Sequence, residues 1–485
     1  MSLAGIARPD SQKRARLAIG GSHCQKPRSY RNLTHLGTLP LPDNPTPRRF
    51  APRGPLRGTI TVPGDKSISH RALIFGALAV GKSRIAGLLE GEDVLATAAA
   101  MRQMGAKIER DGETWVVEGV GVGSLLEPET ALDMGNSGTS TRLLMGLIAG
   151  HAISATFIGD ASLSARPMGR VIEPLGQMGA SFTASRAGEP QDTLPLTMRG
   201  ANPAVPITYR LPVASAQVKS AILLAALNTA GTTTVIEPVP TRDHSERMLK
   251  GFGAAIETET VAEERHIRIH GPGDLAPQDI VVPGDPSSAA FFAVAASIVP
   301  ESDVTIRNVG LNPTRNGIFQ VLEAMGADIA YEDRREVGGE PVADLRVRHA
   351  ELHGVEVDPA LAPSMIDEFP VLFVAAALAK GTTTTSGLHE LRVKESDRLA
   401  TMARALTAAG AQVEEREDGL VIEGTGGTPL RGTANEGVAT ALDHRIAMSM
   451  AIAGIASRDG VEVDDTGPIA TSFPGFADLL EGLTQ

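Results

Sequence analysis

Lysine and arginine side chains recur at the predicted starts of apolar helices in this sequence. Lys66 and Arg71 flank one start, Arg142 follows a second, and Arg445 begins another. A helix N-terminus presents free N–H groups and a partial positive charge, and a neighbouring cation strengthens it as an anion site. Arginine adds a planar fork that grips carboxylate or phosphate through two hydrogen bonds. These residues predict one shared site for small anions, and the alternative is that they are solvated surface charges.

More cations lie at or between the helix starts, although the whole chain is acidic, with a net charge of −12. They are Arg166, Arg170, Lys219, Arg242, Lys394 and Arg398. The helix start at Ser287 carries no cation. The positive charges are therefore confined to some segments, which favours a single anion-binding cleft.

Two carboxylates stand among these cations. Asp367, in "SMIDEFP", is expected one turn into an apolar helix, and Glu395 follows Lys394 directly in "VKESDR". An acid held among cations can carry a proton in catalysis. A salt bridge or a helix cap is the alternative, and the pattern alone favours it. No clustered His or Cys pattern indicates a metal ligand set, so we expect no metal.

The segment "GALAVGKS", residues 76 to 83, matches the nucleotide-binding loop G-x-x-x-x-G-K-[ST]. Such a loop must run from a strand into a helix, so that backbone N–H groups face the phosphate. Here an apolar helix precedes the match and a β-rich run follows it. We therefore interpret it as a helix end, a capping glycine and the start of a strand.

A repeat organises the chain. Six apolar, alanine-rich stretches of helical length start 71 to 79 residues apart, at Ser67, Gly138, Ser215, Ser287, Ser364 and Asp443. Between them a second helix ends in Gly-Ala and is followed by two strands with a polar turn, as at Gly105. One unit thus reads strand–helix–strand–helix–strand–strand, which predicts an α/β protein.

Two copies of "VPGD", Val62–Asp65 and Val282–Asp285, lie three repeats apart. They predict two similar domains of three units each, a continuous one over 63–284 and a discontinuous one over 50–62 plus 285–485. The VPGD segments would be the crossings between them.

Residues 1–49 differ in character from the rest. The first 50 residues carry nine Lys and Arg against two Asp, and they contain Cys24, the only cysteine of the chain. We predict a disordered basic extension, with a transit peptide as the alternative. The remainder lacks an apolar run long enough to span a membrane, and its negative charge and 3% aromatic content argue against nucleic-acid binding.

Several segments resemble successive signatures of the EPSP synthase family, the 3-phosphoshikimate 1-carboxyvinyltransferases. They are "PGDKSISHRAL", "GNSGTSTR", "GDASLSARPMGR", "SAQVKSAILLAAL", "LRVKESDR" and "DHRIAM". The likeness spans about 50–485 in order. It implies two inside-out α/β barrel-like domains, with the active site in the cleft between them. It also implies a cytoplasmic, monomeric enzyme of the shikimate pathway, without cofactor.

The resemblance implies transfer of the enolpyruvyl group of phosphoenolpyruvate to the 5-hydroxyl of shikimate 3-phosphate, with release of phosphate. The residues matched to shikimate 3-phosphate are Lys66, Ser67, Arg71, Ser215, Gln217, Arg242, Asp367 and Lys394. Those matched to phosphoenolpyruvate are Lys66, Gly138, Arg166, Gln217, Arg398 and Arg445. Asp367 matches the acceptor of the hydroxyl proton, while Lys394 and Glu395 match the groups that move protons at the methylene carbon; Lys66 completes the catalytic set.

The sequence departs from the family pattern at two places. Ala216 stands where many members have a second serine. Thr471 stands where many have a lysine, so one positively charged side chain that contacts phosphoenolpyruvate is missing or supplied elsewhere. Gly138 is the glycine of glyphosate-sensitive members, which predicts that glyphosate competes with phosphoenolpyruvate here. The alternatives are the sister enolpyruvyl transferase for UDP-N-acetylglucosamine, whose usual loop cysteine this body lacks, and a non-catalytic anion-binding protein.

Overall fold

The structure is a computed structural model that describes residues 45–184, 192–433 and 437–483. Residues 1–44, most of the predicted extension, lie outside the described part. The predicted boundary at residue 49 is wrong, because Arg48 and Arg49 belong to strand β1 (Arg48–Phe50), which pairs with β21 (Val461–Val463). Backbone hydrogen bonds to that strand give these residues a defined place.

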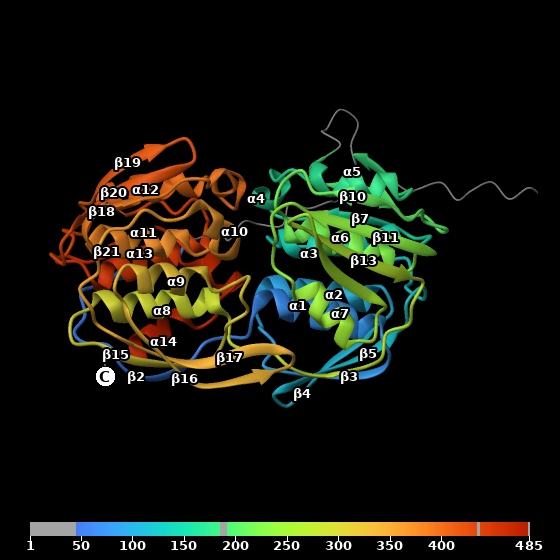
Figure 1. Ribbon diagram of the computed structural model, residues 1–485, viewed down its shortest axis with the longest axis horizontal. Helices are drawn as coiled ribbons and strands as arrows, with labels where there is room; N and C mark the ends of the chain where they lie inside the picture. Colours follow the sequence, from blue (N-terminus) through green and yellow to red (C-terminus); the bar gives the residue numbers. More distant parts are fainter. Residues whose placement is uncertain (1–44, 185–191, 434–436, 484–485) are drawn as a thin grey trace, which may run out of the picture. The chain divides into compact units, whose positions relative to one another are not determined.

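The first part of the chain builds sheets with one repeated strand order. In each, the outer strand runs parallel to the second, and a hairpin adds two antiparallel strands (Figure 1). The sheets are β14 (Asp279–Val281), β3 (Val80–Ala86), β5 (Thr114–Val120) and β4 (Lys107–Asp111); β6 (Leu132–Asp133), β7 (Ser154–Ile158), β9 (Leu196–Arg199) and β8 (Ser181–Ala184); and β10 (Thr208–Arg210), β11 (Gly231–Glu237), β13 (Glu264–Gly271) and β12 (Ile256–Val261).

The second part repeats this order once in full, with β2 (Arg57–Thr61), β15 (Asp303–Gly310), β17 (Glu340–Arg348) and β16 (Asp328–Val337). A three-stranded sheet follows, with β18 (Lys380–Thr384), β20 (Gly419–Thr425) and β19 (Gln412–Arg416). The sixth unit differs from the expected pattern: after β21 the chain forms η3 (Gly467–Thr471) and α14 (Phe476–Gly482) in place of a hairpin. Phe476 packs against Phe292 of the core, and β1 supplies the strand that pairs with β21.

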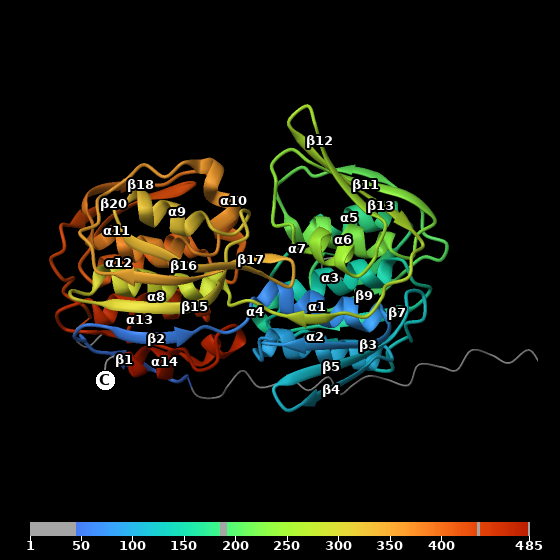
Figure 2. The ribbon, with the colours of Figure 1, turned by 60° about the horizontal axis from the view of Figure 1, so that its bottom comes forward.

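The six long apolar helices that the repeat predicts lie inside the sheets, the inside-out arrangement that the family resemblance implies. They are α1 (Lys66–Leu78), α3 (Gly138–Ala149), α6 (Ala216–Ala226), α8 (Pro286–Ile298), α11 (Phe369–Leu378) and α13 (His444–Ile455). Helix α11 contacts α8 and α13, and α3 contacts α6, with strands outside them (Figure 2). Nearly every residue of these helices is buried, which is why they lack the polar stripe of a surface helix. The α/β fold class predicted from the repeat is confirmed.

The remaining helices are shorter or lie toward the surface. They are α2 (Glu92–Gln103), α4 (Ala161–Ser164), α5 (Gly169–Gln177), α7 (His244–Gly251), α9 (Gly317–Ala324), η1 (Pro359–Leu361), α10 (Ala362–Met365), η2 (His389–Val393) and α12 (Arg398–Ala408). The Gly-Ala pairs follow several of them: Gly105, for example, has φ +103°, a conformation that ends a helix and that glycine adopts without strain. Among the described residues no helix is long and apolar enough to cross a membrane.

The nucleotide-loop pattern in "GALAVGKS" spans a helix end and a strand. Helix α1 ends at Leu78, and β3 starts at Val80, so Lys82 and Ser83 lie in the strand. The order is helix then strand, as predicted, and the segment cannot cradle a phosphate with helix N–H groups. Gly81 lies within β3, with φ +130°, so it does not cap the helix; Ala79 occupies the cap position.

The fifth predicted helix is broken. Helix α10 ends at Met365, and α11 starts at Phe369, so Asp367 lies in the link between them and not one turn into a helix. Pro370 explains the break, because its ring would clash with the carbonyl of Ile366 in a continuous helix. The break places Asp367 outside both helices.

The VPGD segments pair with each other. Asp65 N donates to Pro283 O at 2.8 Å, and Asp285 N donates to Pro63 O at 2.9 Å. Buried apolar side chains form one cluster from Ile68 to Val282, and a second from residues 50–62 and 289–483. We propose that these clusters are the cores of two domains with the predicted boundaries at the VPGD segments.

Candidate functional site

Asp367 lies at the centre of the candidate site. Its carboxylate is within 2.7 Å of Arg242 Nη2, 3.1 Å of Arg398 Nη1 and 3.4 Å of Lys394 Nζ. Arg242 precedes α7, Lys394 precedes α12, and Arg398 is the first residue of α12. Residues that are distant in the sequence therefore converge on one carboxylate, as the predicted shared site requires.

The charge state of Asp367 follows from these neighbours. Burial acts to raise the pKa of its carboxyl, but Lys394, Arg242, Arg445 and Arg398 outweigh burial and hold the pKa well below its usual range. Arg445 also donates to the Asp367 carbonyl at 3.1 Å. Asp367 is thus ionised and able to accept a proton, and an anion that neutralises the cations would make it a stronger base.

Glu395 forms a second carboxylate centre beside the first. It pairs with Arg398 at 2.6 Å and approaches Arg166 Nη1 at 3.7 Å, while its carbonyl accepts from Ser162 Oγ at 3.3 Å. Burial would raise its pKa, but Arg398 and Arg166 lower it well below the usual value. Arg398 therefore bridges Asp367 and Glu395, and it is 1% exposed.

Gly138 lies under two guanidinium groups. A Cβ atom at this position would be 2.8 Å from Arg142 Nη1 and 3.3 Å from Arg166 Nη1. Arg142 in turn donates to Gln217 Oε1 at 3.0 Å, and Gln217 Nε2 donates to Thr139 at 3.1 Å. The starts of α3 and α6 are joined in this way, so Gly138, Arg166 and Gln217 belong to one cluster.

Lys66 is held by a carboxylate that the sequence did not indicate. Its ammonium pairs with Asp93, the second residue of α2, whose side chain is 7% exposed. Burial raises the pKa of Asp93, Lys66 opposes that rise, and Glu395 adds to it. The Lys66–Asp93 pair is therefore close enough to Glu395 to be part of the same electrostatic site.

Arg71 is turned toward the protein interior. Its guanidinium donates to Ser245 Oγ and Ser220 Oγ, both at 2.7 Å, and to the Ser67 carbonyl at 2.9 Å. Burial lowers its pKa to about 10. Arg71 thus links α1 to α6 and α7 through Ser220 and Ser245. Ser67 takes part in this network through its backbone carbonyl.

Ser215 caps α6. Its Oγ accepts from Val218 N at 3.4 Å, which satisfies one of the free N–H groups at the helix start. The cap leaves further N–H groups of α6 available for an anion. Ser215 is thus near Gln217 in the chain, but no side-chain contact joins it to the Asp367 cluster among the described residues.

Lys219 does not belong to the anion site. Its ammonium is fully buried and pairs with Glu237 at 3.0 Å and Glu246 at 2.8 Å. One turn into α6, the side chain points to the core side of the helix, where these two acids neutralise it. Lys219 is therefore an exception among the cations that favoured a single anion-binding cleft.

The helix starts around the cluster provide further anion-binding capacity. Gly138, Arg398 and Arg445 lie in the first turns of α3, α12 and α13. The side chains of Ser137, Asp397 and Asp443 each cap one N–H group of these helices. The remaining N–H groups and the helix dipoles favour negative charge at this place.

Sequence reasoning missed several residues that complete the network. They are Asp93, Asp160, Glu368 and Asp443. Asn136 accepts from Arg166 at 2.5 Å, and Asp443 accepts from Arg398 Nε at 2.8 Å. A helix-cap pattern could have identified Asp443, whereas no local signal marks Asp93. Thr471, at the place of the family's lysine, donates to the Pro468 carbonyl at 2.8 Å.

No group of three or more His, Cys, Asp and Glu side chains within residues 45–184, 192–433 and 437–483 has an arrangement that could hold a metal ion. The groups that the site presents are ammonium and guanidinium groups, helix N–H groups and two ionised carboxylates. Such a set can bind two anions side by side and move protons between them.

Comparison with known proteins agrees with this description. A family model of EPSP synthase (3-phosphoshikimate 1-carboxyvinyltransferase) matches residues 50–480. The 3-phosphoshikimate 1-carboxyvinyltransferase of Novosphingobium aromaticivorans is 70% identical over 442 residues, which cover 90% of this chain and 99% of that protein. The same enzyme of Sphingopyxis alaskensis is 69% identical over 443 residues, which cover 91% and 99%.

A solved structure is also similar. The EPSP synthase of Acinetobacter baumannii superposes with a TM-score of 0.78 at 44% sequence identity, over 90% of this chain and 97% of that one. The family match, the identity and the shared fold cover the same residues that build the cluster around Asp367. This chain belongs to the EPSP synthase family.

Proposed function

We propose that this protein transfers the enolpyruvyl group of phosphoenolpyruvate to the 5-hydroxyl of shikimate 3-phosphate and releases phosphate. The observation that carries the proposal is the position of Asp367, an ionised carboxylate in contact with Arg242, Lys394 and Arg398. A reaction between two anions needs such a set, because the cations must hold both substrates while a base removes the hydroxyl proton.

In the proposed addition step, Asp367 takes the proton of the 5-hydroxyl as the oxygen attacks C2 of phosphoenolpyruvate. The double bond opens, and C3 receives a proton to become a methyl group. We assign that proton to the Lys394 ammonium, 3.4 Å from Asp367 Oδ1, because Glu395 is ionised at this stage. The product of this step is a tetrahedral intermediate that carries both the phosphate and the new ether bond.

In the proposed elimination step, a base removes a proton from the methyl group, the double bond forms again, and the C2–O bond to phosphate breaks. Glu395 is suited to accept that proton because it is ionised beside Arg398 and Arg166. When substrate anions occupy these two arginines, the positive charge that depresses the pKa of Glu395 is partly neutralised. The carboxylate then holds a proton more readily than in the free enzyme.

The substrate assignments follow the two sides of the cluster. We assign the phosphoenolpyruvate anion to Gly138, Arg166, Arg398 and Arg445. We assign the phosphoshikimate side to Ser67, Arg71, Ser215, Arg242, Asp367 and Lys394, and both substrates share Lys66 and Gln217. Arg71 would need to exchange one of its serine contacts to reach a ligand. All of these residues come from one chain, so we propose that the enzyme acts as a monomer, and in the cytoplasm, where phosphoenolpyruvate is made.

Phosphate release tests the function. Desalted protein with EDTA is given phosphoenolpyruvate and shikimate 3-phosphate together, each alone, and ATP alone. Release that needs both substrates is expected. Release with ATP alone would contradict the proposal. Release only when UDP-N-acetylglucosamine replaces shikimate 3-phosphate would assign the sister reaction instead.

A further inference from the structure

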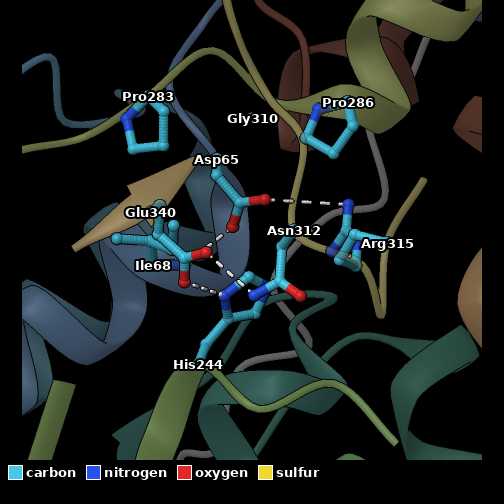
Figure 3. A pocket seen from close by; sticks show the side chains of 9 residues that line it. All are labelled: Asp65, Ile68, His244, Pro283, Pro286, Gly310, Asn312, Arg315 and Glu340. Atoms are coloured by element: carbon cyan, nitrogen blue, oxygen red, sulfur yellow. Dashed lines mark hydrogen bonds and ion pairs between the residues drawn. The ribbon is translucent and has the colours of Figure 1, made fainter. Parts of the chain in front are cut away.

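Both VPGD segments border a small buried cavity (Figure 3). Asp65 and Pro283 come from the two segments, and His244, Arg315 and Glu340 close the cavity from other elements. Its volume is about 10 Å³, which is room for about one water molecule and for no substrate. The polar residues that line the cavity therefore bind one another and the VPGD segments, and they do not bind a separate ligand.

Arg315 is the cation that faces both crossing aspartates. Its Nη2 atom is 3.0 Å from Asp285 Oδ1 and 3.7 Å from Asp65 Oδ2, and it donates to Ser287 Oγ at 2.7 Å. The residue is 2% exposed. Burial acts to raise the pKa of Asp65, but Arg315 and His244 outweigh it and lower the pKa. One guanidinium thus contacts two buried carboxylates and lowers the pKa of Asp65.

These two carboxylates hold the start of α1. Asp65 Oδ1 accepts from Ile68 N at 2.8 Å, and Asp285 Oδ2 accepts from Lys66 N at 3.2 Å. Both bonds go to backbone groups of the first turn, so they set where the turn lies. Because Lys66 is the first residue of α1, the position of its ammonium depends on both carboxylates and through them on Arg315.

A second connection runs from Arg315 toward Arg445. Ser287 Oγ, which accepts from Arg315, donates to Glu368 Oε1, and the same Glu368 oxygen is 3.5 Å from Arg445 Nη1. Glu368 is 1% exposed and follows Asp367 directly in the link between α10 and α11. The guanidinium of Arg315 is thus two hydrogen bonds away from the carboxylate that pairs with Arg445.

We propose that Arg315 is a positioning residue for the reaction. It holds Lys66 through Asp65 and Asp285, and it holds Arg445 through Ser287 and Glu368, so that the two cations stay at a fixed separation across the substrate site. The proposal rests on the substrate assignments of the proposed function. Arg315 itself touches no substrate, and it acts only through the groups that it aligns.

The variant Arg315→Lys tests this role, because it keeps the charge and removes the planar fork. We expect kcat/KM for both substrates to fall by about tenfold or more, since small misplacements of binding groups have large kinetic effects. Ser287→Ala cuts only the connection toward Arg445. It should raise KM for phosphoenolpyruvate and leave KM for shikimate 3-phosphate unchanged. Arg346→Lys is the matched control, because Arg346 of β17 also holds a carboxylate, that of Asp303 on β15, through two hydrogen bonds.

Hydrogen exchange gives a readout that does not depend on turnover. Peptides covering residues 63–72 and 362–370 should exchange faster in Arg315→Lys than in the wild type, and the peptide covering 401–410 should not change. Wild-type exchange and kinetic constants in Arg315→Lys would overturn the proposal. So would a loss of activity that matches the fraction of unfolded protein. Wild-type protein without turnover, combined with faster exchange in the variant, would instead reject the proposed function and retain the positioning role.

Discussion

The Lys66 ammonium forms an ion pair with Asp93, whose side chain is almost entirely buried at the start of α2. Ser140 Oγ of α3 donates to the Asp93 carbonyl at 3.1 Å, which fixes this end of α2. A flexible lysine side chain is therefore anchored by a rigid carboxylate. On the proposed substrate assignments, the pair would let Lys66 present its charge to both substrates without moving between them.

Asp93→Asn should lower kcat/KM for phosphoenolpyruvate by about tenfold or more, because the ammonium loses the charge that fixes its position. The amide has nearly the same shape, so we expect the melting temperature to change little. Steady-state kinetics and thermal unfolding measure the two effects. Asp111→Asn, in an exposed hairpin, is the control. Unchanged kinetics in Asp93→Asn would show that the ion pair has no part in catalysis.

Gly138→Ala should weaken the binding of both phosphoenolpyruvate and glyphosate. The added methyl group would lie 2.8 Å from Arg142 Nη1, which is already bonded to Gln217, so one of the guanidinium groups has to shift. We expect KM for phosphoenolpyruvate and the inhibition constant of glyphosate each to rise by about tenfold, the effect of about 1.4 kcal/mol of overpacking.

The wild type should be inhibited by glyphosate competitively against phosphoenolpyruvate. Gly176→Ala is the matched control, because a Cβ atom there meets nothing within 4 Å. Wild-type activity that persists in millimolar glyphosate would reject the assignment of Gly138 to the inhibitor's site.

Asp367→Asn should remove the proton acceptor. We expect kcat to fall by about 10² to 10⁴, the usual contribution of a general base. Binding of shikimate 3-phosphate should be retained, since Arg242 and Lys394 lose an internal counter-charge and stay free to hold the substrate. Calorimetric titration and single-turnover rates separate these effects. A variant that binds weakly but turns over normally would assign Asp367 to positioning, with Asp274→Asn as the exposed control.

The repeat and the helix starts were predictable because they depend on local patterns: apolar periodicity, glycine at helix ends and caps. The gathering of Lys394 and Arg398 at one anion site was predictable from the residue pattern. Proton-transfer roles for Asp367 and Glu395 were suggested only by the resemblance, because the pattern alone favoured salt bridges or helix caps. Asp93 was not predictable, since its partner Lys66 is brought near only by the packing of α1 against α2. The inward turn of Arg71 toward Ser220 and Ser245 likewise depends on tertiary contacts.

Lys219→Met should destabilise the protein strongly. Lys219 is fully buried, and its loss would leave the buried Glu237 without a cation and Glu246 with only Arg265, at 3.7 Å. We expect a loss of about 3–5 kcal/mol in the free energy of unfolding by urea. The combination with Glu237→Gln should cost less than the sum of the single changes, because one orphaned charge is then removed. Additive losses would show that the pair does not interact, and Lys250→Met, on the surface, should have little effect.

The pH dependence of stability should report the charge on Glu395. Its pKa in the folded protein is well below that of an unfolded glutamate, which is about 4.3. A carboxyl with a depressed pKa stabilises the fold at pH values above the unfolded pKa, and this stabilisation is lost as the pH falls through the folded pKa.

The variant Glu395→Gln removes that titration. Near pH 7 we expect it to be less stable than the wild type by about 1–3 kcal/mol, since Arg398 loses a charged hydrogen-bond partner. The difference should shrink as the pH falls below about 4.5, where the unfolded wild type takes up a proton and the folded form does not. Urea unfolding at a series of pH values measures it, with exposed Glu113→Gln as the control. A difference that stays constant down to pH values near the folded pKa would mean that the Arg398 and Arg166 charges do not hold Glu395 ionised.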